Sequence, residues 1–135
     1  MADPSINLIL PWPPSVNSYW RHPSSGRLAG RHLISSSGRA YRQAVRDAWI
    51  EQGAGIIVGP HRLELTIYAY PPDKRRRDLD NLFKGALDSL VHAGVFEDDS
   101  QIDALCIHRL FVVKDGSLDV SIKIRQEDGN GNEDA

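Results

Sequence analysis

Apolar residues return at helical spacing between residues 79 and 91, and this stretch limits the possible folds more than any other part of the chain. One face of three successive turns is filled by Leu79, Leu82, Phe83, Ala86, Leu87, Leu90 and Val91. Gly94 comes shortly afterwards and can adopt the left-handed conformation that closes a helix. We therefore predict an amphipathic helix over these residues.

Alternating apolar residues predict four strands around this helix. The patterns cover residues 6–10, 62–70, 105–113 and 118–124, and prolines stop the first two. A second helix is expected from near residue 37 to Gly53 or Gly55, because apolar side chains recur there at helical spacing. The order strand, helix, strand, helix, strand, strand predicts an α+β fold in two layers, with two helices on a mixed four-stranded sheet.

The length of 135 residues fits one domain, which we place at residues 1–125. Residues 126–135 contain four acids and no large apolar side chain, so we predict a disordered, solvating tail. No run approaches the length of about 18 apolar residues that a membrane span requires. The single cysteine, Cys106, cannot form an internal disulfide and is expected in the core. With no leader-like amino terminus, a reducing cytoplasm is the expected location.

The net charge of −2 hides an uneven distribution along the chain. Residues 1–96 carry 12 Lys and Arg against 8 Asp and Glu, whereas residues 97–135 carry 4 against 10. Residues 15–37 contain Arg21, Arg27 and Arg31 beside aromatic and histidine side chains, and no acid. We predict a long basic loop without regular structure, which is suited to nucleic acid; the alternative is a flexible surface loop whose arginines have no functional role.

Residues 75–84 place three arginines, two aspartates and a lysine at the start of the predicted helix. Arginine binds phosphate through paired donors, and carboxylates bind Mg²⁺. Helical geometry puts Asp80, Lys84 and Asp88 on one strip opposite the apolar face. Asp78 would lie about 200° from Asp80 if it were helical, so we expect it before the first turn. Asp78 and Asp80 then form a two-carboxylate platform, although aspartates at a helix start also serve as ordinary stabilising residues.

A second acidic cluster, at residues 97–99, follows the same helix. The intervening helix spans roughly 24 Å, so the two clusters cannot meet along it. They could meet only if the strand after Asp99 returned beside the strand before Asp78, or if the turn packed differently.

Four segments together resemble the RusA-type Holliday junction resolvases. They are residues 11–17, residues 19–22, residues 75–81 with Lys84, and residues 94–101, in an order that extends from Ile6 to Ile124. The resemblance implies a homodimeric, Mg²⁺-dependent endonuclease of DNA recombination and repair, which nicks two strands symmetrically across a four-way DNA junction. Mn²⁺ is a possible substitute for Mg²⁺.

The resemblance also implies roles for individual residues. Asp78, Asp80 and Asp99 match the family's metal-binding carboxylates, Lys84 matches an essential lysine, and Asp98 is the alternative to Asp99. The family's fold is expected to bring the later aspartate to the first two. Backbone phosphates are expected to contact six arginines, namely Arg21, Arg27, Arg31, Arg75, Arg76 and Arg77.

Other functions fit the sequence less completely. A non-catalytic phage or plasmid nucleic-acid-binding protein would use the arginines but leave the carboxylates unexplained, and a Mg²⁺ requirement for cleavage separates the two. A nucleotide-sugar transferase lacks room for its donor domain. The histidines show no paired spacing, so a zinc site is not expected.

For the dimer interface, Trp12, Trp20 and Phe111 are candidate contributors.

Overall fold

The computed structural model describes residues 5–125. Its elements in chain order are β1 (Ser5–Pro11), α1 (Val16–Tyr19), β2 (Trp20–Arg21), β3 (Leu33–Ile34), α2 (Ser36–Gln52), β4 (Leu63–Tyr70), α3 (Asp80–Ala93), the 3-10 helix η1 (Asp99–Gln101), β5 (Ile102–Arg109) and β6 (Ser117–Ile124). The predicted α+β class is confirmed. The predicted acidic tail, residues 126–135, lies outside the described residues.

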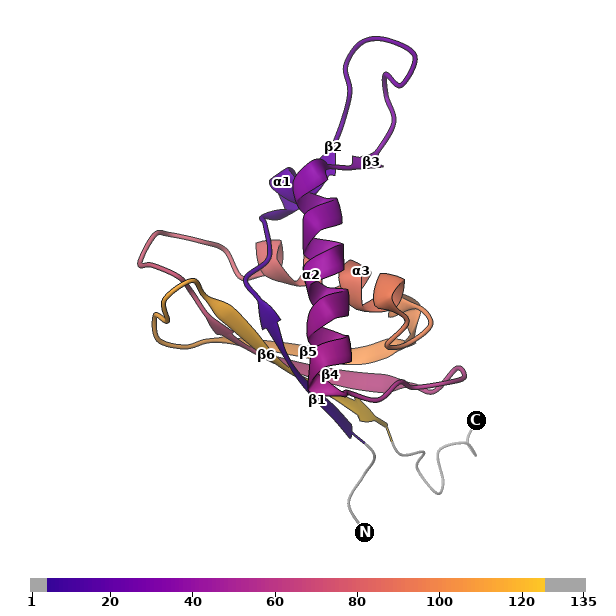
Figure 1. The fold of residues 1–135 in the computed structure, drawn as a ribbon, viewed down its shortest axis with the longest axis vertical. Coiled ribbons are helices and arrows are strands. Elements are labelled where there is room, and N and C mark those ends of the chain that lie inside the picture. Colours follow the sequence, from indigo (N-terminus) through magenta and orange to yellow (C-terminus); the bar gives the residue numbers. More distant parts are fainter. Residues whose placement is uncertain (1–4, 126–135) are drawn as a thin grey trace.

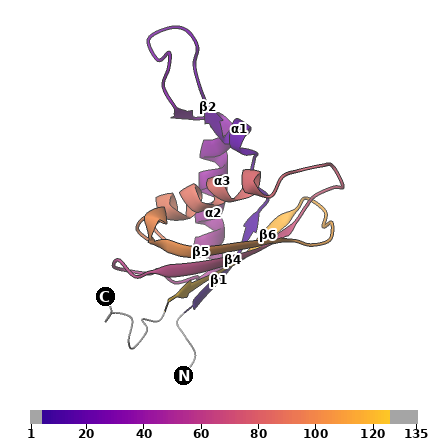
Figure 2. The same ribbon diagram turned by 180° about the vertical axis from the view of Figure 1, so that it is seen from behind.

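The main sheet has the strand order β1-β6-β4-β5. Strands β1 and β4 both run antiparallel to β6, whereas β4 and β5 are parallel. Parallel neighbours require a crossover connection, and α3 provides it. Both longer helices lie on one side of the sheet, with α3 crossing above β4 and β5 (Figure 2). This arrangement places the start of α3 beyond the end of β4.

Alternation along the strands determines the core. On β4, Leu63, Leu65, Ile67 and Ala69 are buried, and the residues between them are not. They pack with apolar side chains of β1, β6, α2 and α3 in one cluster. None of the helices within residues 5–125 combines the length and apolar character that a bilayer crossing requires.

The sheet face away from the helices is uncovered. Cys106, expected in the core, is exposed, so that prediction is wrong. The reason is its position on the edge strand β5, where it pairs in register with Thr66, a residue between the buried positions of β4. On the same face His108 stacks on Tyr68 with ring centroids 5.1 Å apart.

Two segments depart from the predicted secondary structure. Residues 15–37 contain α1 and the pair β2–β3, in which Trp20 faces Ile34 and Arg21 faces Leu33. Residues 20–34, which we call the arm, project from the body beside the first turn of α2 (Figure 1). The strand predicted at residues 105–113 instead covers Ile102–Arg109, because its parallel partner ends just before the proline pair at residues 71–72.

The predicted helix ends are close to those observed. Gly94 closes α3 in the left-handed conformation, with φ 88°. Gly53 closes α2 in the same way, with φ 64°. At the start of α2, the Ser35 hydroxyl accepts a hydrogen bond from the Gly38 amide at 2.9 Å. Asp78 lies outside α3, as predicted.

Candidate active site

The three consecutive arginines before α3 have different surroundings. Asp73 forms ion pairs with Arg75 at 3.1 Å and Arg77 at 2.9 Å. Hydrogen bonds from Arg77 and from the Arg75 amide keep the pKa of Asp73 well below its usual range. Arg77 also lies over the Trp12 ring, 5.6 Å from its centroid. Arg76 is exposed and forms no ion pair or hydrogen bond through its side chain within residues 5–125, so its donors are available to a ligand.

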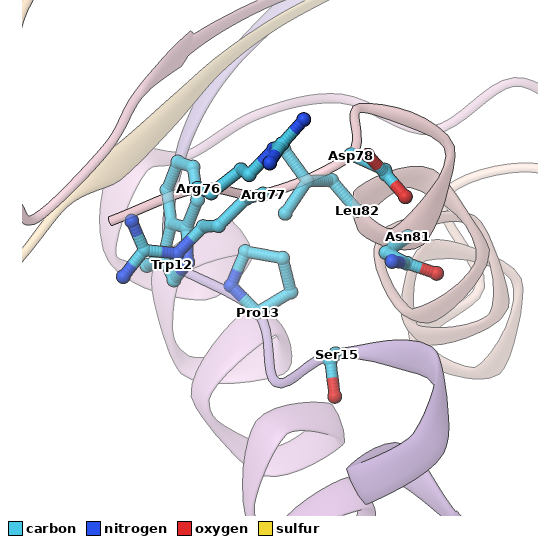
Figure 3. Close-up of a pocket in the computed structure, with 8 residues that line it drawn as sticks. All are labelled: Trp12, Pro13, Ser15, Arg76, Arg77, Asp78, Asn81 and Leu82. Atoms are coloured by element: carbon cyan, nitrogen blue, oxygen red, sulfur yellow. The ribbon is translucent and has the colours of Figure 1, made fainter. Parts of the chain in front are cut away.

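A cavity of about 550 Å³ opens beside this segment. Its lining consists of Trp12, Pro13, Ser15, Arg76, Arg77, Asp78, Asn81 and Leu82. Figure 3 shows the arginines and Trp12 along one side and Asp78 with Asn81 on the opposite side. The structure therefore joins the Pro-rich turn after β1 to the segment before α3, with cationic and anionic groups across one opening. This is a suitable arrangement for a phosphodiester and its counter-ion.

Asp80 and Lys84 continue the site along α3. Asp80 is the first residue of the helix, and Lys84 lies one turn later; both are exposed. The apolar stripe of the same helix, including Leu82, Ala86 and Leu90, is buried. Carboxylates at a helix start also interact favourably with the positive end of its dipole. Asp78, Asp80 and Lys84 thus lie at one end of α3, as the sequence predicts.

Asp99 lies at the other end of the parallel pair. It begins η1, where Arg62 donates to the Ser100 carbonyl at 2.8 Å and Gln101 donates to the His61 carbonyl at 2.8 Å. These contacts connect η1 to the segment that enters β4. Asp78, in contrast, follows the exit from β4, where Arg109 at the end of β5 donates to the Arg77 carbonyl at 2.5 Å.

The distance between the two ends follows from strand geometry. Leu63 pairs with Ile102 and Ala69 pairs with Arg109, and this length of strand spans about 20 Å. Within residues 5–125, no group of three or more His, Cys, Asp or Glu side chains is arranged to hold a metal ion. Within one chain, the Asp99 end therefore lies apart from Asp78 and Asp80, and a site made of all three aspartates stays a prediction. The strand after Asp99 does return beside β4, but it runs parallel to it.

The structure distinguishes Asp98 from Asp99. The Asp98 carboxylate accepts a hydrogen bond from the Ser100 amide at 2.9 Å, and Gln101 completes a capping box with its own side chain. Hydrogen bonds from Ser100 lower the pKa of Asp98. Asp99 is exposed and has no such partner within the described chain. Asp98 is therefore occupied in capping η1, and Asp99 is free to bind a ligand.

Sequence reasoning missed a buried polar cluster between α1, α2 and α3. Tyr19 is fully buried and its hydroxyl is hydrogen-bonded to Asp88 and Arg42. Arg42 also pairs with Asp88 at 2.8 Å. Burial, followed by the hydrogen bond with Asp88, raises the pKa of Tyr19. Asp88 was expected on the exposed strip with Asp80 and Lys84. No local spacing predicts a contact between residues this far apart in sequence.

Basic side chains gather on a second surface. No Asp or Glu occurs between Asp3 and Asp47, and Arg21, Arg27 and Arg31 are all exposed on the arm. Below the arm, a groove of about 300 Å³ is lined by Ile34, Arg39, Arg42, Gln43, Arg46 and His92. His92 occupies the last turn of α3, so the groove lies toward the Asp99 end. The helical spacing of the three arginines was visible in the sequence, but the contribution of α3 was not.

Comparison with known proteins supports the resemblance. The family model for endodeoxyribonuclease RusA matches residues 11–125. The chain is 44% identical over 114 residues to the crossover junction endodeoxyribonuclease RusA of Enterobacteria phage HK97, covering 84% of this chain and 90% of that protein. The Escherichia coli K12 protein of the same name is 38% identical over 122 residues, with 87% and 93% covered. The protein from Enterobacteria phage 82 is 40% identical over 119 residues, with the same coverage. The chain therefore belongs to the RusA family of endodeoxyribonucleases.

Proposed function

We propose that this protein is a Mg²⁺-dependent endonuclease that resolves four-way DNA junctions by paired, symmetric nicks. The observation that carries the proposal is the cavity at the start of α3, which Asp78 lines together with Arg76 and Arg77. The names of the relatives support the substrate, since they are crossover junction endodeoxyribonucleases. A non-catalytic nucleic-acid-binding protein would use the arm but would have no need for carboxylates at this cavity.

The side chains have chemically distinct tasks in this proposal. Asp78 and Asp80 supply the hard oxygen donors that suit Mg²⁺ or Mn²⁺. A bound divalent cation would polarise the phosphate and favour deprotonation of a water molecule. Lys84 would stabilise negative charge on the phosphate, and Arg76 would hold it. Arg77, already engaged with Asp73 and Trp12, supports the wall of the cavity.

We further propose that the third carboxylate comes from a second copy of the chain. Within one chain, paired strands about 20 Å long separate the Asp99 end from the end with the first two carboxylates. A two-fold axis near the middle of β5, perpendicular to the strand, would set the start of one β5 beside the end of the other. Asp99 of the partner subunit would then lie near Asp78 and Asp80. Each dimer would have two shared sites, as two symmetric nicks require.

The two edges of the sheet differ in a way that favours β5 as the dimer contact. At β1, the Gln52 side chain accepts from the Ile9 amide at 2.8 Å and donates to the Ile9 carbonyl at 2.6 Å. The outer edge of β1 is therefore capped at Ile9. The middle of β5, residues 104–107, is apolar, and Leu105 is 36% exposed. An uncapped apolar edge strand is a template for pairing. Of the three predicted interface residues, Phe111 is 70% exposed beyond the end of β5, whereas Trp12 and Trp20 pack within the chain.

A complementation experiment tests the shared site. Asp80→Asn and Asp99→Asn chains with different tags are co-expressed, and the heterodimer is isolated by both tags. Each mutant homodimer should be inactive, whereas the heterodimer retains one intact site and should nick one strand of a labelled four-way junction in Mg²⁺. Its rate should be about half that of wild type, since one of two sites remains.

The matched control combines Asp78→Asn with Asp80→Asn, which lie at the same end of α3. That heterodimer breaks both sites and should stay inactive. An active wild-type dimer together with an inactive Asp80→Asn/Asp99→Asn heterodimer would reject the shared site. Equal cleavage of the junction by wild type in Mg²⁺ and in EDTA would reject the proposed metal dependence.

A further inference from the structure

Tyr19 occupies a junction between the arm and the two helices that flank it. It is the last residue of α1, directly precedes β2, and has no exposed surface. Its ring packs edge-on against Trp20, with centroids 4.9 Å apart, and Trp20 in turn packs against His32 at 4.5 Å. Side chains from both ends of the arm are thereby connected to one buried residue.

The Tyr19 backbone ties the two ends of the arm together. Its carbonyl accepts a hydrogen bond from the Ser35 amide at 2.9 Å and from the Ser35 hydroxyl at 2.8 Å. Ser35 follows β3 and is also the N-cap of α2. The entry and exit of the arm are thus held at one peptide group and at the first turn of α2.

The Tyr19 side chain reaches α3. Its hydroxyl donates to the Asp88 carboxylate, lies 3.1 Å from the Ser89 hydroxyl and accepts from the Arg42 Nε at 3.1 Å. The same Arg42 Nε lies 2.9 Å from the Asp88 carboxylate. Hydrogen bonds to ionised groups are stronger and more directional than those between neutral groups. One tyrosine is therefore bonded to both α2 and α3.

Two glycines provide the space that Tyr19 occupies. A Cβ added at Gly38 on α2 would lie 2.4 Å from the Tyr19 carbonyl oxygen, and one added at Gly85 on α3 would lie 3.1 Å from its ring. Gly85 belongs to the same helix as Asp80 and Lys84. Gly38 therefore borders the Tyr19 backbone and Gly85 borders its ring, so this residue is closely packed against both helices.

We propose that Tyr19, with Arg42 and Asp88, is a positioning unit that fixes the arm relative to the catalytic end of α3. The arm carries Arg21, Arg27 and Arg31, and α3 carries Asp80 and Lys84. Because the arm and α3 are rigidly coupled, the protein discriminates between DNA shapes. A four-way junction contacts both the arm and the start of α3, and a linear duplex does not. This use of the arm rests on the proposed function, whereas the coupling itself is a property of the fold.

Tyr41 provides a matched control for this role. It too is buried, at 5% exposure, and its hydroxyl donates to the Pro11 carbonyl at 2.7 Å. It belongs to α2, and that bond connects α2 to β1 and not to the arm. Tyr19→Phe and Tyr41→Phe each remove one buried hydroxyl, so both should lower thermal stability. Only Tyr19→Phe should change the arm.

Two measurements separate positioning from simple stabilisation. Limited trypsin digestion at Arg27 and Arg31 should be several-fold faster in Tyr19→Phe than in Tyr41→Phe, because the arm is no longer held by α3. On a four-way junction, Tyr19→Phe should raise KM on the order of tenfold with kcat within about twofold, and should lose preference over linear duplex. Asp88→Asn, which keeps the shape but not the charge, should give an intermediate effect in both measurements.

Indistinguishable digestion and KM for the two tyrosine variants would overturn the proposal. If Tyr19→Phe does not fold, Asp88→Asn is compared with Tyr41→Phe instead. Indistinguishable digestion and KM for that pair would likewise overturn the proposal. The digestion needs no DNA. If the wild-type protein failed to cut junctions, the proposed function would be rejected. Trypsin digestion would still decide whether the arm is coupled to α3.

Discussion

The two ends of the parallel pair β4–β5 carry different parts of the proposed active site. At the exit from β4, Asp78 and Asp80 lie beside a cavity lined by Arg76, whose side chain has no ion pair among the described residues. At the entry to β5, Asp99 is exposed on a short helix held by Arg62 and Gln101, with no arginine run beside it. Within residues 5–125, neither end arranges three carboxylates so that they could hold a metal ion. This division of the carboxylates is what motivates the proposed two-fold partner, which would bring opposite ends of two chains together.

The largest expected effect is on the carboxylates at both ends. Asp80→Asn and Asp99→Asn should each reduce nicking by roughly 10³-fold, because each removes a ligand of the proposed metal. Junction affinity should hold or rise, since a charge that repels DNA is lost. Cleavage and gel-shift assays on the same junction measure both quantities.

Asp98→Asn is the control for Asp99→Asn. Asp98 caps η1 and should affect stability more than activity. If Asp99→Asn nicked the junction at the full rate and Asp98→Asn were impaired instead, Asp98 and not Asp99 would supply the carboxylate at this end.

The next effect concerns β5, the edge strand of the proposed dimer contact. Leu105→Lys should weaken self-association by roughly 100-fold, because two lysines would face each other across the proposed axis. Nicking should be lost with the dimer. Ile9→Lys, on the capped edge β1, is the control. Sedimentation should give twice the 15.0 kDa chain mass for wild type and Ile9→Lys. A dimeric Leu105→Lys protein would remove β5 from the interface.

A smaller effect is expected at the arginine groove near the Asp99 end. Arg39 and Arg46 are exposed and form no ion pair within residues 5–125, whereas Arg42 is engaged by Asp88. The double variant Arg39→Ala/Arg46→Ala should make the dependence of log affinity on log salt shallower by about 1.8, for two lost phosphate contacts. Lys114→Ala, in the turn between β5 and β6, is the control. An unchanged slope would confine phosphate binding to the arm and the Asp78 end.

The smallest effect separates two neighbouring arginines at the Asp78 end. Arg76→Ala should make the salt dependence shallower by about 0.9, for one phosphate contact. Arg77→Ala should leave that slope unchanged and reduce the free energy of unfolding by about 1 kcal/mol, because its ion pair and ring contact are lost. Salt titration of binding and thermal unfolding measure the two. The reverse result would show that Arg77 leaves Asp73 and Trp12 when DNA binds.

Local patterns predicted much of the fold and part of the site. Helix α3, its closing Gly94 and the position of Asp78 outside the first turn follow from spacing and capping, which depend on near neighbours in sequence. The prediction that Cys106 is buried was wrong, because composition does not reveal that a strand lies at an edge. The arm was read as an irregular loop, since a ribbon of two residues per strand leaves no alternating pattern.

By itself, the sequence determined the classes of element, the basic surface of the arm and the pairing of Asp78 with Asp80 at a helix start. Each depends on residues within a few turns of one another. Only the tertiary structure decided that Asp99 lies at the far end, because the direction of β5 relative to β4 is set by the crossover through α3. It likewise decided that Tyr19, Arg42 and Asp88 meet. These contacts join residues far apart in the chain, and they form only when the two helices pack together on the sheet.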